Sequence, residues 1–188
     1  MAAARGRVPA AYRQAAERAP RGVEGGAFTA ELDREESVLF LIGMRINRLR
    51  KVRSWWPAFV GMPRMLAELQ GHPEAGLLGA RNFWSGRVLM SVQHWRSAED
   101  LGRYARNPEL RHHPAWAAFN KAAAGTGDVG IFHETYHVTP DSFETLYGNM
   151  PRFGLALAHT LTARGARTTR TRTQERMGQQ DPEYVDAC

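Results

Sequence analysis

The sequence is poor in cysteine, in lysine and in long apolar runs, and each shortage excludes a class of protein. Its 188 residues include one cysteine, Cys188, so a disulfide framework or a cysteine-based metal site within one chain is excluded. No stretch approaches the roughly 18 uninterrupted apolar residues that a membrane span needs. The first residues also lack the apolar core of a secretory signal. We therefore expect a cytoplasmic protein with no membrane span.

The shortage of lysine bears on how the net charge of +6 is interpreted. Only two of the 25 basic residues are lysine, Lys51 and Lys121, and such a bias is more typical of codon usage than of a selected phosphate-binding surface. Basic residues do gather in the run Arg48–Arg53, where a phosphate-binding stripe is the alternative. We predict no nucleic-acid partner.

The chain divides into three parts by composition. Residues 1–36 are rich in Ala, Arg, Gly and acids without a sustained apolar period, and we expect a flexible N-terminal arm. Residues 159–188 become polar and poor in aliphatic side chains, which predicts a disordered C-terminal tail. Residues 37–158 carry the apolar patterns of one folded domain.

Six main elements are expected in that domain, in the order strand, helix, strand, strand, helix, strand, with one further short helix before the last strand. This order is typical of an α+β ferredoxin-like fold, a four-stranded antiparallel sheet with helices on one face. The other face would be half-apolar and bare, so we expect a homodimer to cover it. The expected elements are a strand over 38–47, a helix from Ser54 with a bend at Pro63, strands over 77–83 and 87–95, a helix from Ser97, a short helix from Pro114, and a last strand over 129–138.

Several segments resemble those of a known family. Gln93–Leu101 resembles the Q-x-W-R-S-x-E-x-L signature of dimeric α/β-barrel proteins. Four more segments, in the same order along the chain, resemble a monooxygenase-like domain of unknown function that is related to the antibiotic-biosynthesis monooxygenases. They are Met62–Leu66, His112–Trp116, Gly130–Tyr136 and Asn149–Pro151. The resemblance covers about residues 38–157.

The resemblance implies a ferredoxin-like dimeric α/β barrel with a pocket between the sheet and the helices of each subunit. Relatives in this superfamily include cofactor-free oxygenases of aromatic polyketides, terpene-tailoring oxygenases, haem enzymes such as aldoxime dehydratases, and isomerases. The reaction therefore has to be argued from the residues of the pocket.

His133 is the first catalytic candidate. Alternation along the last strand puts His133 on one face with Val129, and Glu134 and Tyr136 on the other. An imidazole among apolar neighbours can remove a proton near neutral pH, or bind a metal or haem iron. The alternative is a buried structural histidine, hydrogen-bonded across strands. His137 shares the face of His133 about 7 Å away, which would hold a metal only with outside ligands, so we predict no metal site.

Two further residues are candidates for catalysis. His112 matches the histidine of the H-x-P-A-W pattern of the related family, which implies a place at the mouth of the pocket. Glu134 would orient a base or act as one if buried, although pairing with Arg45 or Arg87 is the structural alternative. Six residues are predicted to bind the substrate, four as aromatic walls and two as polar handles: Trp84, Trp95, Trp116 and Tyr136, with Arg45 and Asn47.

We predict a small oxygenase that acts on a lipophilic secondary metabolite, a polyketide or terpenoid, with a histidine as base or haem ligand. No motif indicates a cofactor, and haem is the one group that the resemblance brings into consideration. A non-oxidative isomerase, cyclase or dehydratase in the same pocket is one alternative. A ligand-binding module without turnover is the other.

Overall fold

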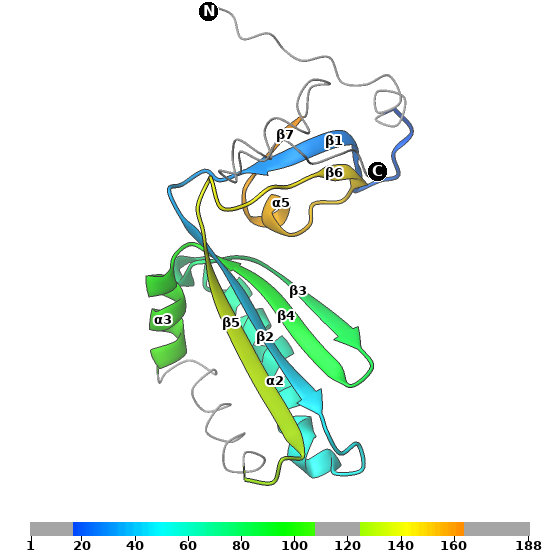
Figure 1. Ribbon diagram of the computed structural model, residues 1–188, viewed down its shortest axis with the longest axis vertical. Coiled ribbons are helices and arrows are strands. Elements are labelled where there is room, and N and C mark those ends of the chain that lie inside the picture. The colour runs from blue at the N-terminus through cyan, green and yellow to red at the C-terminus, as the bar shows by residue number, and fades with distance from the viewer. Residues whose placement is uncertain (1–16, 108–124, 164–188) are drawn as a thin grey trace, which may run out of the picture. The chain divides into compact units, whose positions relative to one another are not determined.

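The computed structural model describes residues 17–107 and 125–163, which fall into two compact units (Figure 1). One unit is Glu36–His137, and the other joins residues from before Glu36 with residues from Val138 onward. No described helix has the length and apolar character that crossing a membrane requires. His112, Trp116 and the short helix expected from Pro114 lie outside the described residues.

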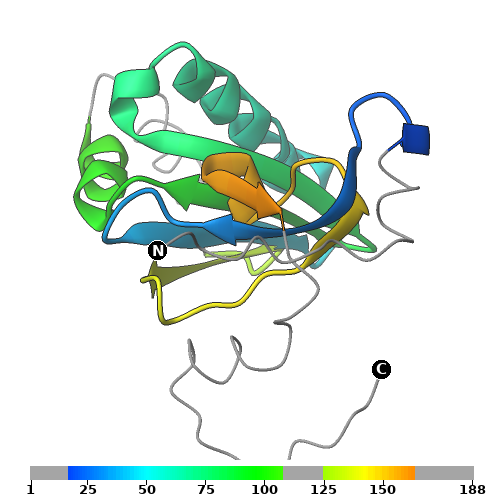
Figure 2. The same cartoon turned by 90° about the horizontal axis from the view of Figure 1, so that it is seen from above.

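The unit Glu36–His137 is built on a four-stranded sheet with strand order β3-β4-β2-β5. Both helices lie on the same side of this sheet (Figures 1 and 2). The α+β ferredoxin-like fold with an antiparallel sheet is thus confirmed. Its elements are β2 Ser37–Ile46, α2 Val52–Gln70, the 3-10 turn η1 Pro73–Ala75, β3 Leu77–Ser85, β4 Val88–Trp95, α3 Ala98–Arg106 and β5 Val129–Val138.

Helix α2 begins two residues before the expected start at Ser54 and continues through both Pro57 and Pro63 to Gln70. Its apolar side chains recur every three or four residues, so one stripe faces the sheet. Leu66 and Leu69 are buried on that stripe. Burial of the stripe stabilises the helix although each proline removes one intrahelical hydrogen bond.

Helix α3 begins where the sequence predicts. The Ser97 hydroxyl accepts a hydrogen bond from the backbone N–H of Asp100 at 3.1 Å and so caps the helix. The Asp100 carboxylate, almost fully buried, accepts a hydrogen bond from Arg96 at 2.5 Å, and this bond holds the pKa of Asp100 below its usual value. Since Arg96 also donates to the carbonyl of Glu74, the residues that follow β4 are tied to η1.

Two clusters of apolar side chains fill the space between sheet and helices. The first joins Val38 and Trp95, both completely buried, to Leu66, Leu69 and Tyr104. The second joins Met44, Ile46 and Val129, with Trp55 and Phe59 packed against it. Because side chains alternate along a strand, these clusters define which residues of β2, β4 and β5 face the helices.

The second unit contains a three-stranded antiparallel sheet that the sequence analysis did not foresee. Its strand order is β6-β1-β7, in which β1 lies in the expected flexible arm and β7 in the expected tail. Residues 138–158, expected within the single domain, group with this sheet. Its elements are β1 Glu24–Glu31, β6 Tyr147–Met150, the short helix α5 Leu155–Ala158 and β7 Thr160–Ala163.

The composition of β1 explains why its strand character was missed. Its buried positions are small residues, among them Ala27, Thr29 and Ala30, which contribute little to an apolar period. Side chains from distant residues hold it instead: Thr145 Oγ1 accepts from the N–H of Ala30 at 2.8 Å, and Asn149 Oδ1 accepts from that of Gly26 at 2.9 Å. These bonds depend on tertiary structure and leave no local pattern.

Candidate functional site

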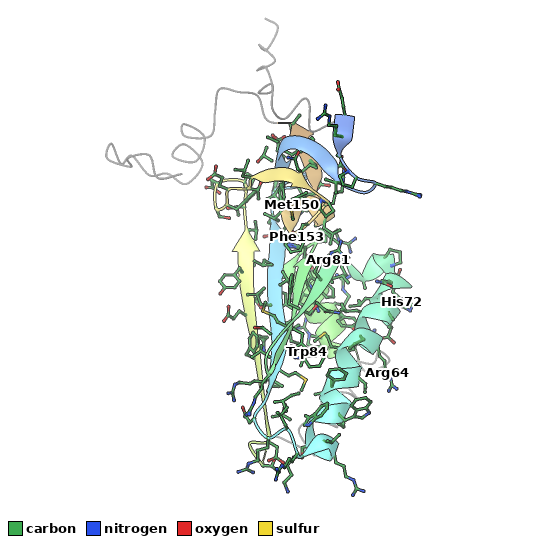
Figure 3. All side chains as sticks on the ribbon, turned by 90° about the vertical axis from the view of Figure 1, so that its right-hand side faces the viewer. Arg64, His72, Arg81, Trp84, Met150 and Phe153 are labelled. Carbon is green, nitrogen blue, oxygen red and sulfur yellow. The ribbon has the colours of Figure 1, made fainter. Side chains whose placement is uncertain are left out.

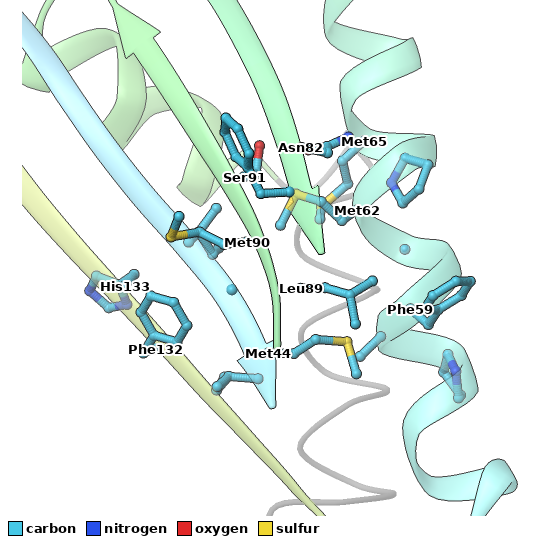
Figure 4. Close-up of a pocket in the computed structure, with 18 residues that line it drawn as sticks. Met44, Phe59, Met62, Met65, Asn82, Leu89, Met90, Ser91, Phe132 and His133 are labelled. Atoms are coloured by element: carbon cyan, nitrogen blue, oxygen red, sulfur yellow. The ribbon is translucent and has the colours of Figure 1, made fainter. Parts of the chain in front are cut away.

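A cavity of about 170 Å³ lies between α2 and the sheet of the unit Glu36–His137 (Figure 4). Residues of β2, β3, β4 and β5 form one wall, and residues 57–65 of α2 form the other. Most of the lining is apolar, with flexible thioethers and aromatic rings that adapt to varied ligand shapes. These side chains include Met44, Phe59, Met62, Met65 and Leu89.

Three polar side chains line the same cavity: Asn82 on β3, Ser91 on β4 and His133 on β5. Asn82 and Ser91 are register partners on adjacent strands, so their side chains are neighbours on one face. His133 lies on β5, and β2 separates β5 from β4 (Figure 4). The cavity therefore has a polar pair on one side and an imidazole on the other.

His133 occupies the strand face that alternation predicts. Val129 belongs to the cluster that faces α2, so His133, four residues further on, shares that face. Its ring centroid lies 5.8 Å from that of Phe40, a residue packed against the cluster around Trp95. The side chain is exposed, and its ring nitrogens have no hydrogen-bond partner among the described residues. These residues thus do not provide the cross-strand bond of the structural alternative.

Glu134 and Tyr136 lie on the opposite face of β5, away from the cavity. The Tyr136 hydroxyl donates a hydrogen bond to the Glu134 carboxylate at 2.5 Å, which raises the pKa of Tyr136 above its usual value. Both side chains are exposed. The two arginines expected to pair with Glu134 donate hydrogen bonds to Asn47 instead. Arg45 donates to the side-chain oxygen of Asn47, and Arg87 donates to its backbone carbonyl.

Of the predicted substrate-binding residues that the structure describes, none is part of the cavity lining. The Asn47 amide donates to the carbonyl of Gly127 at 3.0 Å and ties the end of β2 to the turn before β5. Trp84 contacts the ring of Phe59 edge-on and is 65% exposed, on the side of the sheet that faces α2 (Figure 3). Trp95 is completely buried in the core. Arg45, Asn47, Trp84 and Trp95 therefore remain predictions without a contact to the cavity.

The sequence analysis missed the buried polar residues of β4. Trp95 Nε1–H donates to Gln93 Oε1 at 2.9 Å, and Gln93 Nε2–H donates to Ser91 Oγ at 3.3 Å. All three side chains face α2 and are at most 5% exposed. The alternation of β4 would have placed them on one face, but only the register with β3 and the position of α2 show that Ser91 reaches a cavity.

Asp128 fixes the start of β5, the strand that carries His133. Its carboxylate accepts a hydrogen bond from the Ser54 hydroxyl at 2.9 Å and an ion-paired one from Arg48 at 2.9 Å. The hydrogen bond from Ser54 lowers the pKa of Asp128 most, and the hydrogen bond from Arg48 lowers it further. Because Ser54 is in the first turn of α2, this carboxylate joins that helix to β5.

In the described ranges, 17–107 and 125–163, no group of three or more His, Cys, Asp or Glu side chains is arranged to hold a metal ion. The imidazole of His137, which shares the strand face of His133, lies 3.9 Å from a carboxylate oxygen of Glu36. His133 alone of the two lines the cavity.

Residues 37–155 match the monooxygenase af470-like family. The chain belongs to this family. The predicted membership of a monooxygenase-like group is thereby confirmed, and the match spans the whole cavity. No curated protein matches the chain.

Several solved structures are similar to the chain at low sequence identity. An aldoxime dehydratase in complex with butyraldoxime superposes with a TM-score of 0.53 at 16% identity, covering 80% of this chain and 42% of that one. SnoaB, a cofactor-independent oxygenase from Streptomyces nogalater, gives a TM-score of 0.39 at 13% identity over 54% of this chain and 91% of that one. A possible oxidoreductase from Bacteroides thetaiotaomicron gives a TM-score of 0.39 at 14% identity, over 56% of this chain and 100% of that one.

Proposed function

We propose that this family member is a small oxygenase that takes a lipophilic metabolite, such as a polyketide or terpenoid, into the cavity between α2 and the sheet. The observation that carries the proposal is an apolar cavity with one imidazole, His133, in its wall. Its ring nitrogens have no partner among the described residues, so no other described side chain competes with a substrate proton for them.

The chemistry requires a substrate with an acidic C–H bond. His133 removes the proton from a CH₂ group that a carbonyl or phenol activates, and the carbanion passes an electron to O₂. Recombination forms a C–O bond and, with return of a proton, a hydroperoxide. Loss of water from the hydroperoxide leaves a carbonyl, so CH₂ and O₂ become C=O and H₂O. Apolar walls around a bound substrate limit the access of the water that would otherwise protonate the carbanion.

A dehydratase is the second candidate, and the superposition with an aldoxime dehydratase supports it. Haem would fit this wall in one respect: a histidine at an apolar cavity is a common haem ligand, and His133 lines this cavity. Bound haem would supply an iron centre for substrate coordination. Haem titration tests this proposal: a Soret band that His133→Ala abolishes and His137→Ala retains supports it, and no band in the wild-type protein contradicts it.

Oxygen uptake with anthrone, a tricyclic ketone with an acidic CH₂, tests the oxygenase. We expect His133→Ala to lower the rate by roughly 10²–10⁴-fold, the usual contribution of a positioned base. His137→Ala is the matched control, since it removes an imidazole from the same face of the same strand outside the cavity. Equal rates for His133→Ala and the wild-type protein would refute the role of His133. If the protein binds anthrone without oxygen uptake, a ligand-binding module is favoured. If it exchanges protons of anthrone without oxygen uptake, an isomerase or cyclase is favoured.

A homodimer is the proposed state of the protein. The sheet face opposite the helices includes Phe83, Phe132 and Tyr136, which are 39%, 36% and 48% exposed, together with the half-buried Met90 and Val92. A patch of this kind favours a protein partner. A second copy would cover it and keep β5 from shifting relative to β2, which supports the position of His133.

A further inference from the structure

The Ser91 hydroxyl is a hydrogen-bond donor whose direction is fixed by its neighbours. An indole N–H can only donate, so the Gln93 atom that lies 2.9 Å from Trp95 Nε1 is the amide oxygen. The Gln93 NH₂ group then points the other way, to Ser91 Oγ at 3.3 Å and Met62 Sδ at 3.8 Å. Ser91 Oγ thus accepts a hydrogen bond from Gln93.

The proton of that hydroxyl has no acceptor among the described residues, since Ser91 forms no other hydrogen bond there. Ser91 is 1% exposed and forms part of the cavity wall. A buried donor without an acceptor costs free energy, and a ligand oxygen would satisfy it. Each bond in the chain from Trp95 through Gln93 to Ser91 polarises the next, which strengthens the last donor.

We propose that Ser91 donates a hydrogen bond to a carbonyl or enolate oxygen of the ligand, and that the ligands of this cavity are therefore lipophilic ketones. The proposal deepens the function proposed above and rests on it, because both require a ligand in this cavity. Ser91 and His133 face the same cavity from strands two positions apart, a separation of roughly 10 Å at the backbone. A ring system can span that distance, with its oxygen at Ser91 and its acidic C–H bond at His133.

This arrangement divides the deprotonation between two groups. When His133 removes the proton, the negative charge moves through the conjugated ring system to the oxygen of the ketone. Ser91 is then positioned to stabilise that oxygen, because a preorganised donor binds an enolate more strongly than a neutral carbonyl. The neighbouring Asn82 amide also lines the cavity and can bind a second oxygen.

Binding of two probes that differ by one oxygen tests the proposal. The probes are 2-tetralone, a bicyclic ketone, and tetralin, the same ring system without the carbonyl, both titrated by calorimetry. We expect the wild-type protein to bind 2-tetralone more tightly. Ser91→Ala should lower the affinity for 2-tetralone roughly threefold to tenfold, which is the contribution of one hydrogen bond. The affinity for tetralin should change by no more than about twofold. Gln93→Met should act in the same direction, because it releases the Ser91 hydroxyl from its fixed orientation.

Ser85→Ala is the control, since Ser85 ends β3 and is not part of the cavity lining. It should leave both affinities unchanged, and circular dichroism should show native folds for all variants. If Ser91→Ala binds 2-tetralone as tightly as the wild-type protein does, the role of Ser91 is refuted while the cavity remains a ligand site. If the wild-type protein binds neither probe, the cavity is not the ligand site, and both proposals fail.

Discussion

Alanine in place of Gly43 tests how β5 lies against β2. A Cβ atom at Gly43 would lie 2.5 Å from the carbonyl oxygen of Leu89 and 2.6 Å from Cε1 of Phe132. Favourable contacts between carbon atoms are about 3.5–4.0 Å, so the Phe132 ring has to move. The short contact with the Leu89 carbonyl also requires the backbone of β2 or β4 to shift. The Phe132 ring covers Gly43 on the face away from α2, and this contact requires the next residue, His133, to face the cavity.

The expected cost follows from two opposing effects. Overpacking of this kind destabilises by about 1–3 kcal/mol, whereas replacing a strand glycine by alanine recovers about 0.5–1 kcal/mol. We therefore expect Gly43→Ala to lower the free energy of unfolding by about 1–2 kcal/mol. For a chain of this size the melting temperature should fall by about 2–8 °C.

The matched control is Gly130→Ala, in which an added Cβ would meet only Asn47 Nδ2 at an ordinary 3.7 Å. Thermal unfolding followed by circular dichroism should show a melting temperature equal to or slightly above that of the wild-type protein. Adding Phe132→Ala to Gly43→Ala removes the ring contact and leaves the contact with the Leu89 carbonyl, so the two causes can be separated. If Gly43→Ala is as stable as Gly130→Ala, Phe132 does not lie on Gly43 and the orientation of His133 is refuted.

Three further predictions concern the cap of α3, the acid stability of the second unit and the state of association. Ser97→Ala should lower the free energy of unfolding by about 1 kcal/mol in urea denaturation, because the Asp100 N–H loses its acceptor; an unchanged midpoint would contradict this. Hydrogen bonds from Arg34 and then His159 lower the pKa of Asp33 from 3.8 to about 2. The stability that the Asp33 carboxylate contributes is thus complete above pH 3.8 and is lost as the pH falls through about 2. Asp33→Asn should therefore flatten the dependence of the free energy of unfolding on pH over that range. Val92→Arg should convert the proposed dimer to a monomer in sedimentation experiments, whereas Arg64→Gln at an exposed position of α2, on the other side of the sheet, should not.

The sequence predicted best where local patterns carry the information. The alternation in Val129–Val138 gave the bounds of β5 and the face of His133, and the cap at Ser97 gave the start of α3. Strand β1 was not predicted because its buried residues are small and its side-chain hydrogen bonds come from Thr145 and Asn149, more than 100 residues away. Local periodicity does not register such contacts.

The candidate site was predicted less completely than the fold. The choice of His133 followed from its neighbours on β5, but its place in a cavity depends on how α2 crosses the sheet. Ser91 could not be recognised, because its role depends on the register of β4 with β3 and on a bond to Gln93. Arg45 and Asn47 looked like polar handles from their place at the end of a strand, and they bond to each other instead.

Deuterium exchange at C10 of anthrone, measured by NMR without oxygen, tests most directly whether His133 is a base in this cavity. The C10 protons are acidic because the resulting carbanion is conjugated through both aromatic rings with the carbonyl across the central ring, and their exchange needs no redox step. The account predicts that the wild-type protein and His137→Ala accelerate exchange, and that His133→Ala is slower by roughly 10²–10⁴-fold. Equal exchange rates for His133→Ala and the wild-type protein would contradict it.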